Sequence, residues 1–388
     1  MSRVGDVAMM QGPRGRMRSL GAGAVALATA AVLAGCGSGG GADSNSGKPR
    51  VVTSTNVYAD IASQIAGDRA DVEAIIDDPN KDPHDYEAST ADQLKVSKAS
   101  IVVENGGGYD SFMDSMMKSA DSHPAVVDAV AVSGLPGAED AAGDHDHDHG
   151  AEESQGAAGT ESAAAGDEHD EDHDADHADH ADDEHAHSDH AEESSEAEES
   201  GEHDAHEGHD HGEFNEHVWY SVPTMIKVAH AIEDELKDKA PNDAQAFEDN
   251  TSALVKKLDG LNDSIAQVKK TAQGKKASAT EPVPLWLFSD MGLETITPEE
   301  FLEAVEEGSD VPPLVLKKAQ RQISDGQVVI LGYNTQATNT QAEQLKKSAD
   351  AAGVGVVDLT ETMPQGAHYD EWMGGRIDDI AQKLGAAK

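Results

Sequence analysis

The sequence predicts an α/β protein with two lobes, each containing a mainly parallel sheet flanked by helices, joined by one long rigid helix. Three observations predict this fold. Short runs of β-branched and apolar residues alternate with helical patterns in the first part of the chain. A continuous heptad-like stretch of about 28 residues follows. The alternation of strand and helix patterns then restarts and continues almost to the end of the chain.

Residues 1–35 resemble a bacterial lipoprotein signal peptide. Arginines precede the apolar run "LGAGAVALATAAV", which is shorter than the roughly 20 residues that span a membrane. The run ends in "LAGC", where Cys36, the only cysteine of the chain, takes the place of the lipidated residue. Residues 36–49 have the composition of a flexible linker. We therefore expect an extracytoplasmic protein held at the outer face of the cell membrane by a lipid on Cys36.

The first lobe is expected from residues 50–137 and 214–241. Four apolar runs predict strands, and helical spacing of apolar residues follows the first of them. Strands separated by helices indicate a parallel sheet, in which ligands bind beyond the carboxyl ends of the strands. The loops that follow these strands should therefore surround one cleft. The runs are "RVVTST", "DVEAIID", "ASIVVENG" and "AVVDAVA".

Residues 138–213 are expected to be a disordered insertion within this lobe. The segment holds 30 acidic residues, 14 of the 19 histidines and no Lys or Arg, so −30 of the net charge of −47 lies in it. It has too few apolar residues to bury and too many like charges to pack. The excess of acid also argues against a nucleic-acid partner, since phosphate binding requires clustered Lys and Arg.

Residues 242–273 predict the long linking helix. Apolar residues recur at alternating spacings of four and three from Phe247 to Val268, and Gly274 can end the helix. About 28 residues at 1.5 Å each give a helix of roughly 40 Å, longer than one small lobe needs. A coiled-coil dimer is the competing interpretation, but fewer than four heptads make it the weaker one, and we expect a monomer.

Residues 274–388 predict the second lobe. Strands are expected at "ASATEP", "QVVILGYN" and "VGVVDLT", with helices at "PLWLFSDMG", from Pro298, from Pro312, from about Thr340 and from Asp370. A rigid helix between two α/β lobes leaves a cleft between them. We expect any ligand to bind in this interlobe cleft.

Two histidines outside the insertion are candidate metal ligands. His84 lies in "DPHDYE", a loop after a predicted strand, where Asp85 and Glu87 can orient the imidazole. His217 lies in "NEHVWY", where large apolar residues that follow it fix it to the core. Two core-anchored histidines from separate loops make a metal site plausible, although a single histidine on a loop is more often solvated.

Several ordered motifs resemble the bacterial substrate-binding lipoproteins that deliver zinc or manganese to ABC transporters. The motifs are "VVTSTNVYADIASQIAGD", "DPHDYEAS", "HVWYSVP", "TEPVPLWLFSDMGLETITPEEFLEAVEEG" and "TETMPQGAHYDEWM". The resemblance covers nearly all of residues 50–388 outside the insertion. It implies two α/β lobes joined by one long helix, with the metal bound between the lobes, and an ABC permease with its ATPase as partners.

The resemblance also implies the ligands. His84, His217 and Glu281 occupy three ligand positions of the family, Glu281 standing in "TEP" after the first strand of the second lobe. The fourth ligand of the family is an Asp before a Tyr near the C-terminus. Our alignment places Ala367 there, which leaves His368, Glu361, Asp370 or a water as the fourth ligand.

The donor set suits Zn²⁺ as the transported ion, with Mn²⁺ as the alternative. Two imidazoles and a carboxylate bind either ion, and the carboxylate favours the harder Mn²⁺. Many imidazoles favour Zn²⁺, and long His-rich insertions are typical of the zinc-specific members of the family. We therefore predict capture of Zn²⁺ for a membrane permease, with weak accessory binding in the insertion at His145, His147, His149, His203, His206, His209 and His211.

Two other classes of function are weaker interpretations. A metallohydrolase also uses two His and one Glu with an open position, but the sequence has no HExxH motif and no evident general base beside these residues. We therefore do not expect an enzyme. A metal-buffering adhesin that acts without a permease is the other interpretation, and the chain alone does not distinguish it.

Overall fold

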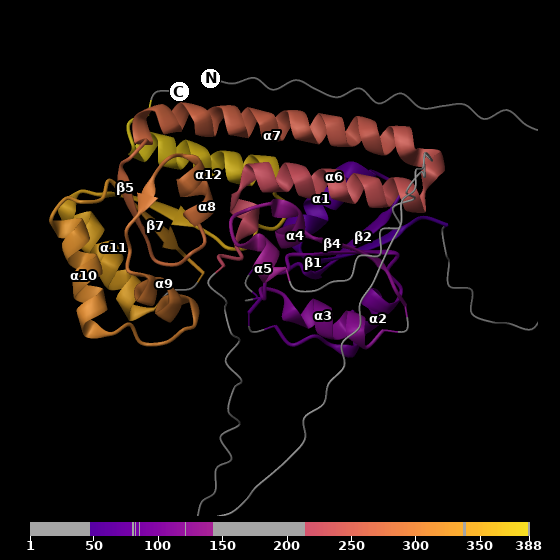
Figure 1. The fold of residues 1–388 in the computed structure, drawn as a ribbon, viewed down its shortest axis with the longest axis horizontal. Coiled ribbons are helices and arrows are strands. Elements are labelled where there is room, and N and C mark those ends of the chain that lie inside the picture. The colour runs from indigo at the N-terminus through magenta and orange to yellow at the C-terminus, as the bar shows by residue number, and fades with distance from the viewer. Residues whose placement is uncertain are drawn as a thin grey trace, which may run out of the picture. The chain divides into compact units, whose positions relative to one another are not determined.

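The computed structural model describes residues 47–386, except residues 80, 82, 85, 121, 143–213, 337 and 338. It confirms the predicted fold class: two α/β lobes with parallel sheets are linked by a long helix (Figure 1). Within the described part of the chain, no helix is both long and apolar enough to span a bilayer. The predicted signal peptide, Cys36 and most of the predicted insertion lie outside the described residues.

The first lobe contains a parallel sheet with strand order β2-β1-β3-β4. Its two central strands, β1 and β3, are almost wholly buried, as expected when helices cover both faces of a parallel sheet. The elements of this lobe are β1 (Arg50–Thr55), α1 (Asn56–Ala66), β2 (Asp71–Ile76), α2 (Thr90–Ser97), β3 (Ile101–Glu104), α3 (Ser111–Lys118), β4 (Ala125–Asp128), α4 (Ala129–Ser133), α5 (Ala138–Ala141), a 3₁₀ turn (Val218–Tyr220) and α6 (Val222–Lys239).

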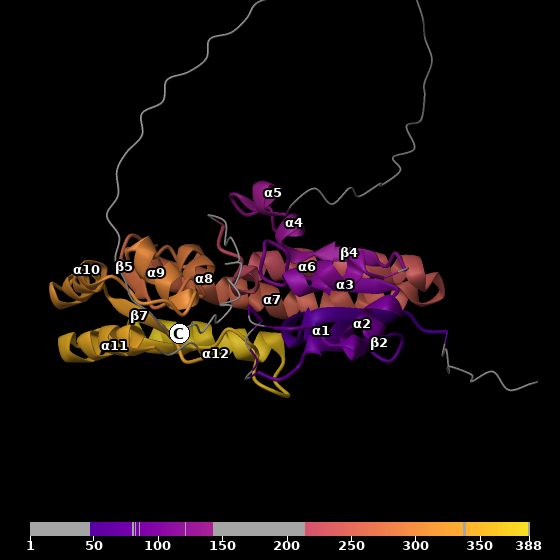
Figure 2. The same ribbon diagram turned by 90° about the horizontal axis from the view of Figure 1, so that it is seen from below.

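The second lobe repeats this strand order as β6-β5-β7-β8. Figure 2 shows α8 and α9 on one side of this sheet and α11 and α12 on the other. The two-residue strand β6 was not predicted, because so short a segment carries no periodicity. The elements are β5 (Lys276–Ala279), α8 (Leu285–Asp290), β6 (Glu294–Thr295), α9 (Glu299–Glu306), α10 (Pro313–Ser324), β7 (Ile330–Asn334), α11 (Thr340–Ala352), β8 (Gly355–Leu359) and α12 (Tyr369–Lys383).

The linking helix is α7 (Ala244–Ala272), preceded by a 3₁₀ turn (Pro241–Asp243). Its 29 residues correspond to about 43 Å. Six of the seven predicted stripe residues are buried, and Leu261 is partly buried. The stripe packs against α1 and α6 of the first lobe and α12 of the second (Figure 1). These contacts account for the heptad pattern within one chain, so no coiled-coil partner is needed to explain it.

A segment of the second lobe, Thr360–Met363, is hydrogen-bonded to the first lobe, and we call it the interlobe seam. Tyr220 Oη donates to the carbonyl of Thr360 (2.6 Å), and Trp219 Nε1 donates to the carbonyl of Glu361 (3.0 Å). Asn56 Nδ2 donates to the carbonyl of Met363 (2.8 Å). The seam follows β8 directly, so the carboxyl end of a strand in one lobe is fixed by side chains of the other.

The structure corrects two boundaries in the first lobe. The predicted strand "AVVDAVA" ends at Asp128, whose side chain accepts a hydrogen bond from the N–H of Ala131 and so caps helix α4. The predicted disordered insertion began at Ala138, but Ala138–Ala141 form the short helix α5 and Ala138 is buried. The residues up to Ala142 therefore belong to the described lobe, and residues 143–213 lie outside the description.

Candidate metal centre

His84 lies on the loop that follows β2, at the carboxyl end of the first sheet. Its two ring nitrogens face different carboxylates: Nε2 lies 3.5 Å from Glu361 Oε1, and Nδ1 lies 3.7 Å from Glu216 Oε1. The ring of Tyr109 packs edge-on against the imidazole, with centroids 5.0 Å apart. The preceding residue, Pro83, is buried, and its ring restricts the backbone of the loop next to His84.

His217 precedes the 3₁₀ turn Val218–Tyr220 and is 1% exposed. Its Nδ1 lies 2.9 Å from Asn215 Oδ1, and Asn215 Nδ2 donates to the carbonyl of Pro282 (3.1 Å). Because the amide nitrogen already donates, Oδ1 accepts, and the imidazole carries its proton on Nδ1. This tautomer has its lone pair on Nε2, the atom through which a histidine with such a partner binds a metal.

Glu361 lies in the interlobe seam and comes from the second lobe. Tyr109 Oη donates to its Oε1 at 2.9 Å, across the boundary between the lobes. The backbone carbonyl of the same residue accepts the indole N–H of Trp219. Both ends of Glu361 are therefore held by residues of the first lobe.

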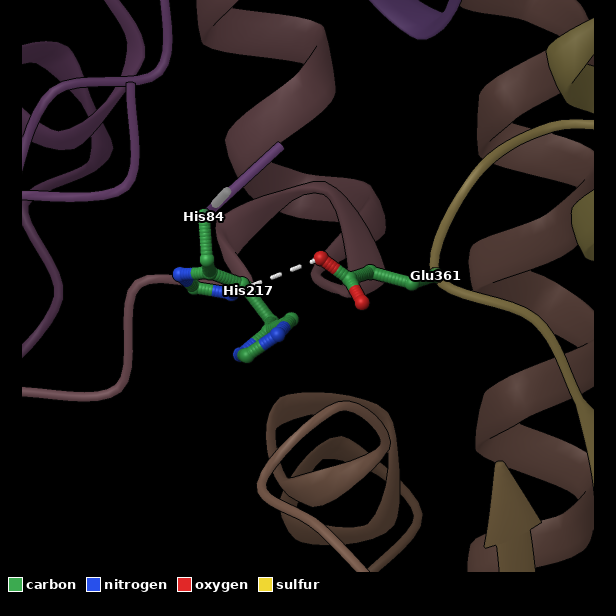
Figure 3. A group of neighbouring side chains, drawn as sticks. All are labelled: His84, His217 and Glu361. Carbon is green, nitrogen blue, oxygen red and sulfur yellow. Dashed lines mark ion pairs between the residues drawn. The ribbon is translucent and has the colours of Figure 1, made fainter. Parts of the chain in front are cut away.

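His84, His217 and Glu361 offer one ligand atom each, and the three atoms lie within 4.8 Å of one another. Figure 3 shows the two imidazoles and the carboxylate, with the ion pair between His84 and Glu361 dashed. The 3.5 Å of this pair is longer than an ordinary hydrogen bond. Two ligand atoms bound tetrahedrally to one Zn²⁺ at about 2.0–2.1 Å lie roughly 3.3 Å apart. The spacing thus matches ligands around an ion better than a hydrogen-bonded pair.

The histidines and the surrounding acids shift one another's pKa values. Burial lowers the pKa of His84, but Glu361, Glu216 and Glu306 together outweigh burial and raise this pKa to about 10. Burial raises the pKa of Glu361, yet the two histidines and Tyr109 hold it below its usual value. Burial and repulsion from Glu216 raise the pKa of Glu306 to about 9. Protons in this cluster therefore take the place that a cation can take.

Both lobes of the chain match one known protein family. The family described as zinc-uptake complex component A, periplasmic, matches residues 51–383. This chain belongs to that family. The match spans both lobes, the linking helix and every residue of the His84, His217 and Glu361 group.

Two relatives that match most of this chain, AdcA and TroA, share less than a quarter of its residues. The zinc-binding lipoprotein AdcA of Streptococcus pneumoniae serotype 4 is 23% identical over 307 residues, covering 78% of this chain and 48% of the relative. The chain thus spans about half the length of that curated relative. The periplasmic zinc-binding protein TroA of Treponema pallidum has a similar fold, with a TM-score of 0.58 and 16% identity over 87% of this chain and 99% of TroA.

A third protein shares the fold. The substrate-binding protein FpvC of Pseudomonas aeruginosa, solved in complex with Mn²⁺, has a TM-score of 0.56 and 19% identity, covering 87% of this chain and 98% of FpvC. At these identities, the solved structures establish the fold of the zinc-uptake component A chain and not its metal.

The structure places the other predicted site residues of this family member differently. Glu281 is buried after β5 and accepts a hydrogen bond from Asn334 Nδ2, but it belongs to neither group of neighbouring ligand atoms found among the described residues. His368 precedes α12, with its side chain 55% exposed and its Nδ1 2.7 Å from Asp60 Oδ1. Of the candidates for the fourth ligand, the structure brings Glu361 to the histidines and leaves His368 elsewhere.

Three residues at the centre were not predicted: Tyr109, Glu216 and Glu306. Glu216 adjoins His217 in sequence, and this adjacency was the one available signal. Tyr109 follows a glycine run after β3, and Glu306 ends α9, so only the tertiary fold brings them to the site. Of the two predicted orienting acids, Glu87 is exposed and Asp85 lies outside the described residues. Glu216 and Glu361 are the acids that face His84.

Proposed function

We propose that this protein is the extracytoplasmic substrate-binding component of an ABC transporter, and that it captures Zn²⁺ between its lobes for a membrane permease. The observation that carries the proposal is the group of His84, His217 and Glu361, which is drawn from both lobes and in which His217 and Glu361 are buried. Membership of the zinc-uptake component A family and the name of the zinc-binding relative AdcA support it.

We propose His84 Nε2, His217 Nε2 and a Glu361 oxygen as three ligands. The three residues offer ligand atoms within 4.8 Å of one another, and the hydrogen bond from His217 Nδ1 to Asn215 favours binding through Nε2. Glu281 is proposed as the fourth ligand, because it is buried in the same region and its charge acts on Glu306. Asn334 orients its Oε2, which leaves Oε1 to turn toward an ion.

Mn²⁺ is the second candidate substrate. The observation that favours it is the number of carboxylates near the histidines, since oxygen donors suit the harder ion. The solved structure of FpvC with Mn²⁺ shows that a relative of this fold binds that ion. Zn²⁺ is preferred here because two imidazoles are part of the proposed ligand set and bind Zn²⁺ more tightly.

We propose attachment to the membrane through a lipid on Cys36 and an ABC permease with its ATPase as partners. The names of the relatives, among them the lipoprotein AdcA, support this proposal. No chemical step is required, because the ion has only to bind, be shielded and be released. The His-rich insertion is proposed to collect ions weakly beside the tight site.

The test is equilibrium competition of Zn²⁺ against Mn²⁺, with the chain lacking residues 143–213 compared with the full chain. The deletion should lower the number of bound ions and leave one tight site that prefers Zn²⁺. Preference for Mn²⁺ by the shortened protein would replace zinc by manganese in the proposal. Loss of the tight site on deletion would place binding in the insertion instead.

Variants of the proposed ligands test the site itself. Glu361→Gln keeps the shape of the side chain and removes its charge, so tight binding should weaken by at least tenfold. Glu303→Gln is the matched control, since Glu303 is an exposed acid on α9. Equal affinity of the two variants would refute the ligand assignment.

A further inference from the structure

A second group of potential ligands adjoins the first. His84, Glu216 and Glu306 offer one ligand atom each, again within 4.8 Å of one another. The two groups share His84 and otherwise use different residues. Neither Glu216 nor Glu306 belongs to the ligand set proposed above, so these two acids require an explanation of their own.

The contacts of the two acids with the histidines resemble the contact in the first group. His84 Nδ1 lies 3.7 Å from Glu216 Oε1, and Glu306 Oε1 lies 3.8 Å from Nε2 of His217, a residue of the first group. Both separations exceed the 2.7–3.2 Å of an ordinary N–H···O hydrogen bond. They are within about half an ångström of the spacing expected between two ligand atoms that bind one ion.

The placement of the acids also separates the two groups. Glu361 lies on the Nε2 side of His84, and Glu216 lies on the Nδ1 side. The two nitrogens of an imidazole point away from each other, so a single ion bound at Nε2 cannot also be bound by the carboxylate that faces Nδ1. A position beside Nδ1 is therefore distinct from the position between the histidines and Glu361.

The number of donor groups gives a further argument. Glu216, Glu281 and Glu361 are buried, and the side chain of Glu306 is 13% exposed. Two imidazoles and two of these carboxylates complete the four ligands proposed for one ion. Glu216 and Glu306 are donors beyond that set, and both lie within reach of His84.

We propose that the centre has two adjacent cation positions that share His84, the second formed by His84, Glu216 and Glu306. This inference rests on the proposed function. The second position has two carboxylates and one imidazole, a donor set that accepts Zn²⁺ or Mn²⁺ and is richer in oxygen than the first. With both positions occupied, His84 bridges the two ions as an imidazolate, and its remaining ring proton is released to solvent.

The experiment is a crystal structure of the full chain with anomalous diffraction at the zinc edge, first at one equivalent of Zn²⁺ and then in excess. Anomalous peaks locate each ion, so ions bound by the insertion do not confuse the result. We expect a peak beside His84 Nε2, His217 and Glu361, and in excess Zn²⁺ a second peak beside Glu216 and Glu306.

Three variants decide the assignment. Glu306→Gln and Glu216→Gln should each lose the second peak and keep the first, while Glu303→Gln should keep both. A single peak at the first position in excess Zn²⁺ would overturn this inference and leave the proposed function standing. Absence of the first peak would overturn the proposed function itself.

A solution measurement provides a second readout. Two Mn²⁺ ions at neighbouring positions broaden each other's EPR signals by dipolar coupling, and isolated ions do not. The difference spectrum between the unmodified chain and Glu306→Gln cancels the insertion, which both proteins carry. A broadened component lost in Glu306→Gln supports the second position, and identical spectra at saturating Mn²⁺ contradict it.

Discussion

At the scale of single residues, the centre depends on side chains that orient ligands as much as on the ligands. Tyr109 contacts Glu361 through its hydroxyl and His84 through its ring. Asn215 accepts a hydrogen bond from Nδ1 of His217 and so fixes the tautomer of this histidine. Partners of this kind commonly affect metal affinity strongly, because they hold the donor atom in the bound geometry before the ion arrives.

Tyr109→Phe should lower the affinity for Zn²⁺ by about 10- to 100-fold, the usual effect of removing a partner of a ligand. The ring, which packs against His84, is retained, so the fold should persist. Competition titration with a chelator measures the affinity, and circular dichroism of the metal-free variant checks the fold. An unchanged affinity would show that the hydrogen bond from Tyr109 to Glu361 does not contribute to metal binding.

His368→Gln should leave metal affinity unchanged, because His368 lies by Asp60 and away from the ligand group. Its effect should instead depend on pH. Asp60 raises the pKa of His368, so the pair stabilises the fold fully below the ordinary histidine pKa of about 6.5, and the stabilisation is lost as pH rises through the raised pKa.

Thermal unfolding of the metal-free protein and of His368→Gln, measured from pH 5.5 to 9, tests this pH dependence. The difference in melting temperature should be largest at the acid end and shrink toward the alkaline end. Because the imidazole is more than half exposed, the difference should be small. A tenfold loss of Zn²⁺ affinity in this variant would instead return His368 to the ligand set.

At the scale of secondary-structure elements, α7 has the clearest sequence pattern and the clearest role. Its apolar stripe was predictable because every buried residue lies at helical spacing along one face. Strands β3 and β7 were predictable for a related reason, since both are buried along their whole length and consist mainly of apolar residues. By contrast, β6 and α5 are too short to show a pattern.

The same distinction holds for the site. His84 and His217 could be assigned from the motifs around them, because the motifs resemble those of a known family. Glu361 was only one of several candidates, since Ala367, which has no ligand atom in its side chain, aligns with the Asp of the family pattern. Glu306 could not be assigned, because its approach to His217 depends on how α9 packs and not on local sequence.

Leu258→Ala should destabilise the metal-free protein by about 2–5 kcal/mol, because it leaves a cavity under a fully buried side chain of α7. Asp263→Ala, at an exposed position of the same helix, is the control and should change stability by less than about 0.5 kcal/mol. Urea denaturation measures both. Similar values for the two variants would mean that the stripe of α7 is not part of the core.

At the scale of the whole molecule, α7 and the interlobe seam join the lobes in two separate places. The helix packs on both lobes, and three carbonyl groups of the seam accept hydrogen bonds from the first lobe. A wide opening would break these contacts together. We therefore expect the ion to leave by displacement of individual ligands, such as His217, with little movement of the lobes.

This expectation can be measured by placing spin labels on exposed positions of the two lobes, with Lys118→Cys and Lys318→Cys in a Cys36→Ser background. The distance between the labels should change by less than about 2 Å when Zn²⁺ binds, as in other pre-organised sites. A shift of several times that size would indicate hinge closure and contradict a rigid connection.

The interlobe seam also couples the affinity for the metal to the free energy that holds the two lobes together. Glu361 offers its carboxylate to the site, and its own carbonyl accepts the indole N–H of Trp219 from the opposite lobe. By linkage, an ion that binds Glu361 strengthens the seam by the same free energy that a loosened seam takes from binding of the ion. A membrane protein that displaced the backbone of this segment would release the ion without contacting the side chains that bind it.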